Sequence, residues 1–164
     1  MSDDYSVCRG VDIAQICLNG HVASGAMRGM PHHNKPFCEL CGEPTISQCR
    51  HCSASIRGVN WEHVSLKYAP PKFCHQCGKP HIWTEQANSA ALELFTEVLD
   101  YDQERREQLR GDLAAIAVDV PQTQVASFRI RKALAKVGKE SVDVVRGMIV
   151  DIASEAAKKI IFPA

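Results

Sequence analysis

Two stretches of the chain repeat one pattern and decide its fold: Lys35-Pro36-Phe37-Cys38-Glu39-Leu40-Cys41-Gly42-Glu43-Pro44-Thr45-Ile46 and Pro71-Lys72-Phe73-Cys74-His75-Gln76-Cys77-Gly78-Lys79-Pro80-His81-Ile82. Each contains a Cys-x-x-Cys pair followed by glycine, which is typical of a metal-binding knuckle. One knuckle supplies two thiolates, so a four-coordinate zinc site needs a second pair of ligands. The repeat therefore predicts metal sites and indicates which cysteines share one.

Four candidate ligand pairs follow one another along the chain. A duplicated unit carries its own closed site, so the repeat favours sequential sites. The intervals between the paired knuckles, residues 22–37 and 53–73, each suit a β-hairpin. We predict a tandem zinc ribbon with two Zn²⁺, one bound by Cys17, His21, Cys38 and Cys41 and the other by Cys49, Cys52, Cys74 and Cys77.

Other arrangements remain open on spacing alone. An interleaved cross-brace joins the first pair to the third and the second to the fourth, and a central site joins the two middle pairs. His21 lies one residue further from its partner than the other second ligands do, and Cys8, His32 or His33 is the alternative fourth ligand. We interpret Cys8 as a small buried thiol. An imidazole among thiolates favours zinc, although such knuckles also hold iron.

The composition contains no membrane or export signal. The most apolar region, residues 148–162, is interrupted by four charged residues and is shorter than the roughly 20 apolar residues that a bilayer requires. The acidic N-terminus lacks the features of a signal peptide. We therefore expect a cytoplasmic protein, in which eight cysteines indicate metal binding rather than disulfides.

After Trp83 the hydrophobic pattern changes from period two to a period near 3.6. This change predicts an α+β protein, with a tandem zinc-ribbon domain at 1–83 and a helical domain of about four helices at 84–164. Thr84, Asp100 or Asp102, and Thr123 are the predicted helix caps. The last helix, predicted over 141–161, has an apolar stripe of Val142, Val145, Ile149, Ile152, Ala156 and Ile160. The stripe favours packing within the chain, and its coiled-coil-like spacing leaves a homo-oligomer as the second interpretation.

Two groups of side chains are candidate partner contacts. The aromatic residues Trp61, Tyr68 and Trp83 suit a protein interface. The helix predicted at 123–139 contains no acid, and its basic residues suit nucleic acid: Arg129, Arg131, Lys132, Lys136 and Lys139. A charge run is also typical of a solvated face, and acids of the preceding helix, Glu104, Glu107 and Asp112, offer an internal partner.

Four protein ligands leave no coordination position for water, so the predicted zincs are structural. We therefore predict a non-enzymatic, zinc-stabilised binding or regulatory module, with protein–protein interaction favoured. The alternatives are a nucleic-acid-binding regulator that uses the helix at 123–139 and an effector enzyme with histidine-based chemistry. The acid–base candidates for the enzyme are His32, His33, Glu62 and His63.

Three further segments carry a family resemblance: Cys77-Gly78-Lys79-Pro80-His81-Ile82-Trp83-Thr84-Glu85, residues 121–129 and residues 151–159. With them the chain resembles bacterial proteins of unknown function that join a double zinc ribbon to a helical C-terminal region. One departure is His81-Ile82, where the resemblance implies an aromatic residue followed by proline. The resemblance supplies neither an activity nor catalytic residues.

Overall fold

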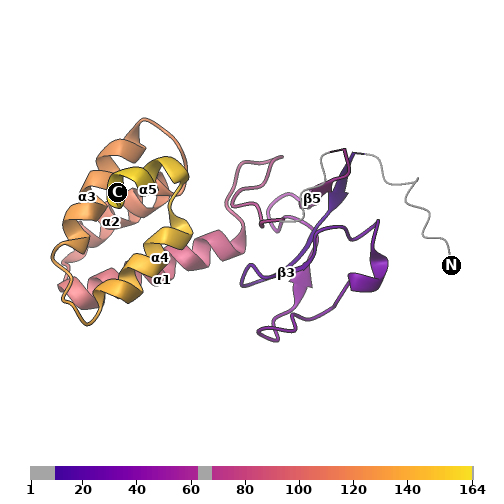
Figure 1. The fold of residues 1–164 in the computed structure, drawn as a ribbon, viewed down its shortest axis with the longest axis horizontal. Coiled ribbons are helices and arrows are strands. Elements are labelled where there is room, and N and C mark those ends of the chain that lie inside the picture. Colours follow the sequence, from indigo (N-terminus) through magenta and orange to yellow (C-terminus); the bar gives the residue numbers. More distant parts are fainter. Residues whose placement is uncertain (1–9, 63–67, 164) are drawn as a thin grey trace. The chain divides into compact units, whose positions relative to one another are not determined.

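The computed structural model describes residues 10–62 and 68–163 (Figure 1). Two compact units divide the chain, Met1–Glu85 and Gln86–Ala164. Short strands and two cysteine clusters make up the first unit, and helices make up the second. The predicted α+β class, with small ribbons followed by helices, is confirmed. That each unit folds as an independent domain stays a prediction.

The first unit consists of two small antiparallel sheets. One pairs β1 (Val11–Ile13) with β5 (Arg57–Asn60), and the other has the order β3-β2-β4, with β2 at Gln15–Cys17, β3 at Val22–Ser24 and β4 at Thr45–Ile46. A 3₁₀ turn covers Pro31–His33. Among the described residues of this unit, the apolar core cluster contains four buried residues, Ala14, Ile16, Ile56 and Trp83. Such a core is too small to hold about 75 residues without additional cross-links.

The strands do not form the two hairpins that the sequence predicts between the paired knuckles. Among the described residues, β3 pairs with β2 and β5 pairs with β1, so both strands find partners that precede the first knuckle. The chain approaches closely at Gly58, where an added Cβ would meet the carbonyl oxygen of Gly25 at 2.2 Å. In the described part of both intervals the hairpin prediction is therefore wrong, because β3 and β5 pair with strands outside those intervals.

Five helices occupy the rest of the chain: α1 (Ile82–Leu99), α2 (Gln103–Ile116), α3 (Gln122–Leu134), α4 (Val142–Ile152) and α5 (Glu155–Ile161). Their fully buried centre contains Phe95, Leu113, Ile116, Ile130 and Ile149. Asp102 caps α2 as predicted, whereas Thr123 lies inside α3 and its hydroxyl donates to Ala115 O. None of the described helices has the length and hydrophobicity needed to cross a membrane.

The helix predicted over 141–161 is two helices. The backbone of Ala153 is extended, and the Ser154 N–H donates to Ile116 O at 2.7 Å. The Ser154 hydroxyl then caps α5 by accepting from Ala157 N at 3.3 Å. After this break the buried positions move by one residue, from the expected Ala156 and Ile160 to Ala157 and Ile161. A single seam along 141–161 is therefore wrong, and oligomerisation stays a prediction.

Candidate metal centres

The repeated sequence builds the same hairpin twice. In each copy the first cysteine N–H donates to a carbonyl five residues later, Cys38 N to Glu43 O at 2.8 Å and Cys74 N to Lys79 O at 2.9 Å. Phe37 pairs with Pro44 and Phe73 with Pro80 in isolated antiparallel bridges. The glycine after each second cysteine has a left-handed backbone, with φ of 76° and 70°. The sequence repeat is therefore a repeat of backbone structure.

The knuckle of Cys49 and Cys52 has the same frame with a different turn residue. Cys49 N donates to Ala54 O at 2.8 Å, and Ser53 N donates to Cys49 O at 2.9 Å. Ser53 occupies the left-handed position, with φ of 59°. This conformation costs an L-residue about 1–2 kcal/mol. The closed turn around the cysteines offsets that cost.

Sheet pairing brings the ligands of the first cluster together. Cys17 is the last residue of β2. This strand pairs with β4, the strand that directly follows the Cys38–Cys41 knuckle in the chain. The Cys17–His21 pair has one more intervening residue than the Cys-x-x-Cys pairs, and the chain turns there at Gly20, whose φ is 87°. This conformation lets His21 N donate to Cys17 Sγ at 3.2 Å. An added Cβ at Gly20 would also lie 3.0 Å from the Trp83 side chain, so the turn needs glycine for two reasons.

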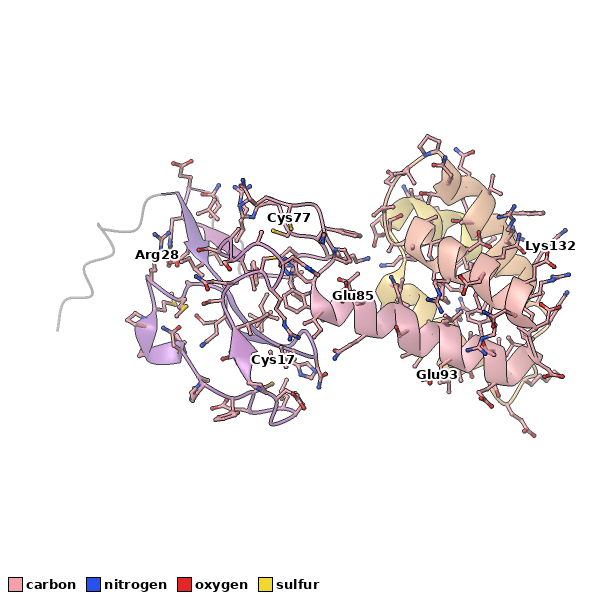
Figure 2. The ribbon with its side chains drawn as sticks, turned by 180° about the vertical axis from the view of Figure 1, so that it is seen from behind. Cys17, Arg28, Cys77, Glu85, Glu93 and Lys132 are labelled. Atoms are coloured by element: carbon pink, nitrogen blue, oxygen red, sulfur yellow. The ribbon has the colours of Figure 1, made fainter. Side chains whose placement is uncertain are left out.

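The side chains gather into two groups of four. In the first, the donor atoms of Cys17, His21, Cys38 and Cys41 all lie within 4.8 Å of one another, and in the second those of Cys49, Cys52, Cys74 and Cys77 do. Figure 2 labels one member of each group, Cys17 and Cys77. In both groups the first residue of each pair is buried and the second is exposed. The structure brings together the groups that the repeat indicates, not those of a cross-brace or a central site.

The distances within both groups fit a tetrahedral zinc ion. Zn–S bonds of about 2.3 Å place two sulfurs about 3.8 Å apart, and a Zn–N bond of about 2.0 Å places nitrogen and sulfur about 3.5 Å apart. The sulfurs of Cys17 and Cys41 are 3.8 Å apart, and His21 Nδ1 lies 3.6 Å from Cys17 Sγ and from Cys38 Sγ. In the second group, two pairs of sulfurs are separated by 3.9 Å and 3.6 Å. These distances exceed the roughly 2.05 Å of a disulfide bond, so the donor sets fit a metal.

In the second group, the pKa values of two thiols are shifted in opposite directions. Backbone N–H groups of Cys77 and Gln76 lower the pKa of Cys74 to about 6, against the effect of burial. The Ala54 N–H lowers the pKa of Cys52, but burial and the neighbouring thiols outweigh it and raise this pKa to about 12. Four thiolates without a cation are therefore unfavourable at neutral pH. A divalent metal would displace the remaining protons and neutralise part of the charge.

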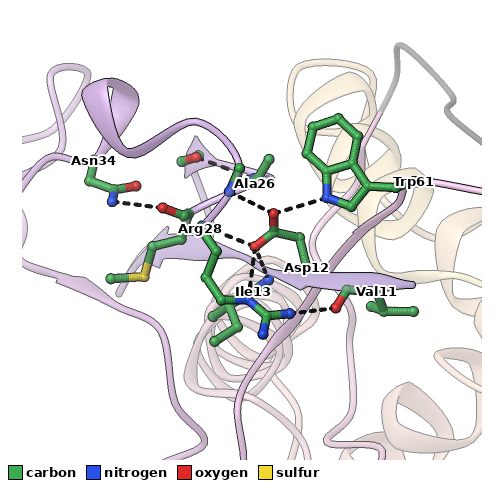
Figure 3. Close-up of polar contacts among 10 residues, drawn as sticks. Val11, Asp12, Ile13, Ala26, Arg28, Asn34 and Trp61 are labelled. Atoms are coloured by element: carbon green, nitrogen blue, oxygen red, sulfur yellow. Dashed lines mark hydrogen bonds and ion pairs between the residues drawn. The ribbon is translucent and has the colours of Figure 1, made fainter. Parts of the chain in front are cut away.

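A buried carboxylate holds the loop that follows β3. Asp12 is only 3 % exposed, and its two oxygens accept four N–H groups, from Ile13, Arg28, Gly29 and Trp61, at 2.6 to 3.0 Å (Figure 3). The Arg28 guanidinium lies 3.5 Å from the carboxylate and donates to Val11 O. Asp12 is not among the site residues predicted from the sequence. Its position between two apolar residues of a strand signals a solvent-facing side chain.

The aromatic candidates pack within the first unit. The Trp83 indole is buried and donates to Pro71 O at 2.9 Å, and the Tyr68 hydroxyl donates to Arg57 O at 2.6 Å. Trp61 donates to Asp12, as described above. The His81 ring stacks on Trp83 with centroids 4.6 Å apart, and so fills the place of the aromatic residue that the family resemblance implies. These placements favour structural roles, and partner contact by these residues stays a prediction.

The remaining candidates divide into those that the structure places apart from the clusters and those outside the described residues. The rings of His32 and His33 lie beside each other in the exposed 3₁₀ turn, with centroids 4.2 Å apart and tilted by 45°, and neither belongs to a metal group. Glu62 is exposed. Cys8 and His63 lie outside the described residues. The histidine-based chemistry of the enzyme hypothesis gains no assembled acid–base pair from the part of the chain that is described.

The basic segment predicted as one helix over 123–139 ends its helix at Leu134. Of its cations, Arg129 pairs with Asp112 at 3.2 Å, and Lys132 lies 4.9 Å from the centre of the Phe128 ring. The expected partner Glu107 instead contacts Arg110 on its own helix at 3.7 Å. Internal neutralisation of this segment by α2 is therefore limited to Asp112 among the described residues.

Comparison with known proteins identifies a family without an assigned activity. The model of a family described as "Uncharacterized protein conserved in bacteria (DUF2321)" matches residues 11–161. No curated protein and no solved structure matches the chain. The match spans both units, so the ribbons and the helices belong to the same family.

Proposed function

Because the chain belongs to this uncharacterised bacterial family, we propose its function from the structure: a non-enzymatic binding module held together by two Zn²⁺ ions. The observation that carries the proposal is the pair of clusters with four protein donors each. When bound, zinc would cross-link segments that the four-residue apolar core cannot hold. The seven cysteines and His21 would provide four ligands to each ion, and such a site has no coordination position left for a reacting water.

Protein–protein interaction is the favoured use of such a module. The first knuckle of the repeat leaves Phe37 61 % exposed and Leu40 79 % exposed, beside the buried Cys38. Exposed apolar side chains on a rigid, metal-held turn suit the anchors of an interface, since little conformational entropy is lost when they bind. We propose this turn as the partner-facing surface of the module, in addition to Trp61 and Tyr68.

Metal counting on intact protein tests the proposal. Native mass spectrometry of the protein purified from its own cells should show two zinc ions per chain, together with any retained partner. Cys38→Ser should remove one ion and Cys74→Ser the other, because each change opens only one cluster. Cys8→Ser is the matched control and should retain both ions. Iron in place of zinc would change the assigned metal, and fewer than two ions in the wild type would contradict the proposal.

A second candidate, a nucleic-acid-binding regulator, rests on the basic segment. Arg131, Lys132, Lys136 and Lys139 have no ion-pair partner among the described residues, in contrast to Arg129. Contact with phosphates would give an affinity that falls steeply with salt. Electrophoretic mobility shift at two salt concentrations, with Arg131→Gln as the variant, would separate this candidate from the first.

A further inference from the structure

A groove between α2 and α3 forms a cavity in the second unit. Its volume is about 530 Å³, within the range of about 300–1,000 Å³ that is typical of small-molecule sites. Residues from one face of α2 and from the facing side of α3 line it, and Tyr101 lies at the start of α2. The groove is separate from both metal clusters in sequence and in composition.

Four cations and one acid line this groove. The cations are Arg105, Arg129, Lys132 and Lys136, and the acid is Asp112. Arg129 and Asp112 neutralise each other across the groove at 3.2 Å. The other three cations come from opposite walls and have no carboxylate partner among the described residues. Figure 2 labels one of these three cations, Lys132, on the helical unit. An anion in the groove would therefore meet several positive charges at once.

The floor of the groove is apolar. Leu109, Ile130 and Ala133 line it and are at most 7 % exposed, while Tyr101 adds an aromatic ring at the rim. A bare inorganic anion would leave this floor uncovered. A ligand with both an anionic group and an apolar or aromatic part would cover it, and Gln108 offers an amide for a further hydrogen bond.

We propose that the groove binds an organic phosphate of about mononucleotide size. The phosphate would lie among Arg105, Lys132 and Lys136, because Arg and Lys together suit a dianion. The organic part would lie on Leu109 and Ile130. The volume matches a single small molecule rather than a continuous polymer. This site goes beyond the metal module, since it uses the helical unit alone.

Titration of the intact, zinc-loaded chain tests this proposal. Adenosine 5′-monophosphate is the probe, added at physiological salt while amide NMR shifts are recorded. We expect saturable shifts that are largest at Gln108 and Ala133. Inorganic phosphate should compete at higher concentration. The double variant Arg105→Glu/Lys136→Glu should weaken binding of the probe by at least about tenfold, because it removes two charge-assisted contacts.

The matched control is Arg106→Glu/Lys159→Glu, which changes the net charge equally at exposed sites that do not line the groove. It should bind the probe as the wild type does. Thermal unfolding of both double variants checks that each is folded. An absence of saturable shifts, or an equal loss of affinity in the control, would overturn the proposal. Binding of a thymidine dodecamer without binding of the monophosphate would also overturn it, in favour of a polynucleotide surface.

Discussion

At the scale of single residues, Asp12 is a charged group held inside a unit that has little apolar core. Burial raises the pKa of its carboxyl, but N–H donors from Arg28, Ile13, Gly29 and Trp61 outweigh burial and lower this pKa below its ordinary value of 3.8. The carboxylate accepts from segments that are 16 to 49 residues away in sequence. It therefore serves as a cross-link between β1, the loop after β3 and the end of β5.

Asp12→Asn should lower the free energy of unfolding by about 2–3 kcal/mol, the range of a lost hydrogen bond to a charged group. Both carboxylate oxygens face N–H donors, so either orientation of the amide places its NH₂ against another donor. Urea unfolding followed by tryptophan fluorescence measures the change. The exposed control Glu62→Gln should change stability by less than about 0.5 kcal/mol. Equal stabilities of the two variants would contradict this role.

The contribution of Asp12 should also depend on pH. A carboxyl group whose pKa is lowered on folding stabilises the folded state fully above its unfolded pKa, near 3.8, and loses this contribution as the pH falls through the folded value. The stability difference between wild type and Asp12→Asn should therefore be constant from pH 5 to 7, a range of about two units. It should shrink below about pH 4. A difference that grew in acid would contradict the assigned sign.

At the scale of elements, the boundary between α4 and α5 decides which residues the last segment buries. Ser154 donates its N–H to Ile116 O at the end of α2, and its hydroxyl caps α5. The one-residue shift at this point places Ala157 and Ile161 in the core, with exposures of 0 % and 4 %. The short α5 depends on this cap, because seven residues cannot hold a helix without tertiary support.

Ser154→Ala should lower the free energy of unfolding by about 1 kcal/mol, the typical cost of a lost N-cap. Thermal unfolding followed at 222 nm measures the loss. Ser154→Asp, which keeps an acceptor at the cap, should restore most of it. An alanine variant as stable as the wild type would show that the Oγ contact with Ala157 N at 3.3 Å contributes nothing.

Gly147 lies in the middle of α4, exposed, with open space where a Cβ would be. Gly147→Ala should therefore raise the free energy of unfolding by up to about 1 kcal/mol, since alanine restricts the unfolded chain and favours the helix. The same thermal scan measures the gain. Gly20→Ala is the opposing comparison and should destabilise, because its backbone is left-handed and Trp83 lies beside it.

At the scale of the whole molecule, the two units differ in the interactions that stabilise them. The first unit has four buried core residues and two metal-type clusters, while eighteen buried residues form the core of the helical unit without any cysteine. Bound zinc would stabilise only the former.

Removal of zinc by a chelator should affect the structure of the first unit but not that of the helical unit. A strong zinc chelator should shift the fluorescence of Trp61 and Trp83, which lie in the first unit, and leave most of the circular dichroism at 222 nm unchanged. The helices retain their own core, which explains the difference. Cys38→Ser with one zinc left should show an intermediate fluorescence shift. A simultaneous loss of both signals would contradict independent stabilisation.

The sequence by itself determined the features that depend on neighbours along the chain. The Cys-x-x-Cys-Gly pattern specifies both knuckles of the repeat through bonds that span five residues, and the repeat indicated the two groups of donors that the structure brings together. The periodic stretch after Trp83 predicted helices, and the α+β class is confirmed. Zinc itself, the independent domains and the partner contacts stay predictions.

Only the tertiary structure decided the features that depend on distant segments. Alternation pointed Asp12 toward solvent, but the loop at Arg28 and Gly29 covers it and supplies its donors. The 3.6-residue hydrophobic period continues through Ser154 in the sequence. The helix nevertheless breaks there, where the Ser154 N–H donates to Ile116 O on another helix. The groove exists because α2 and α3 lie against each other and bring Arg105 and Lys132 to one cavity. Each outcome is set by contacts between groups far apart in sequence, and no local pattern encodes which groups will meet.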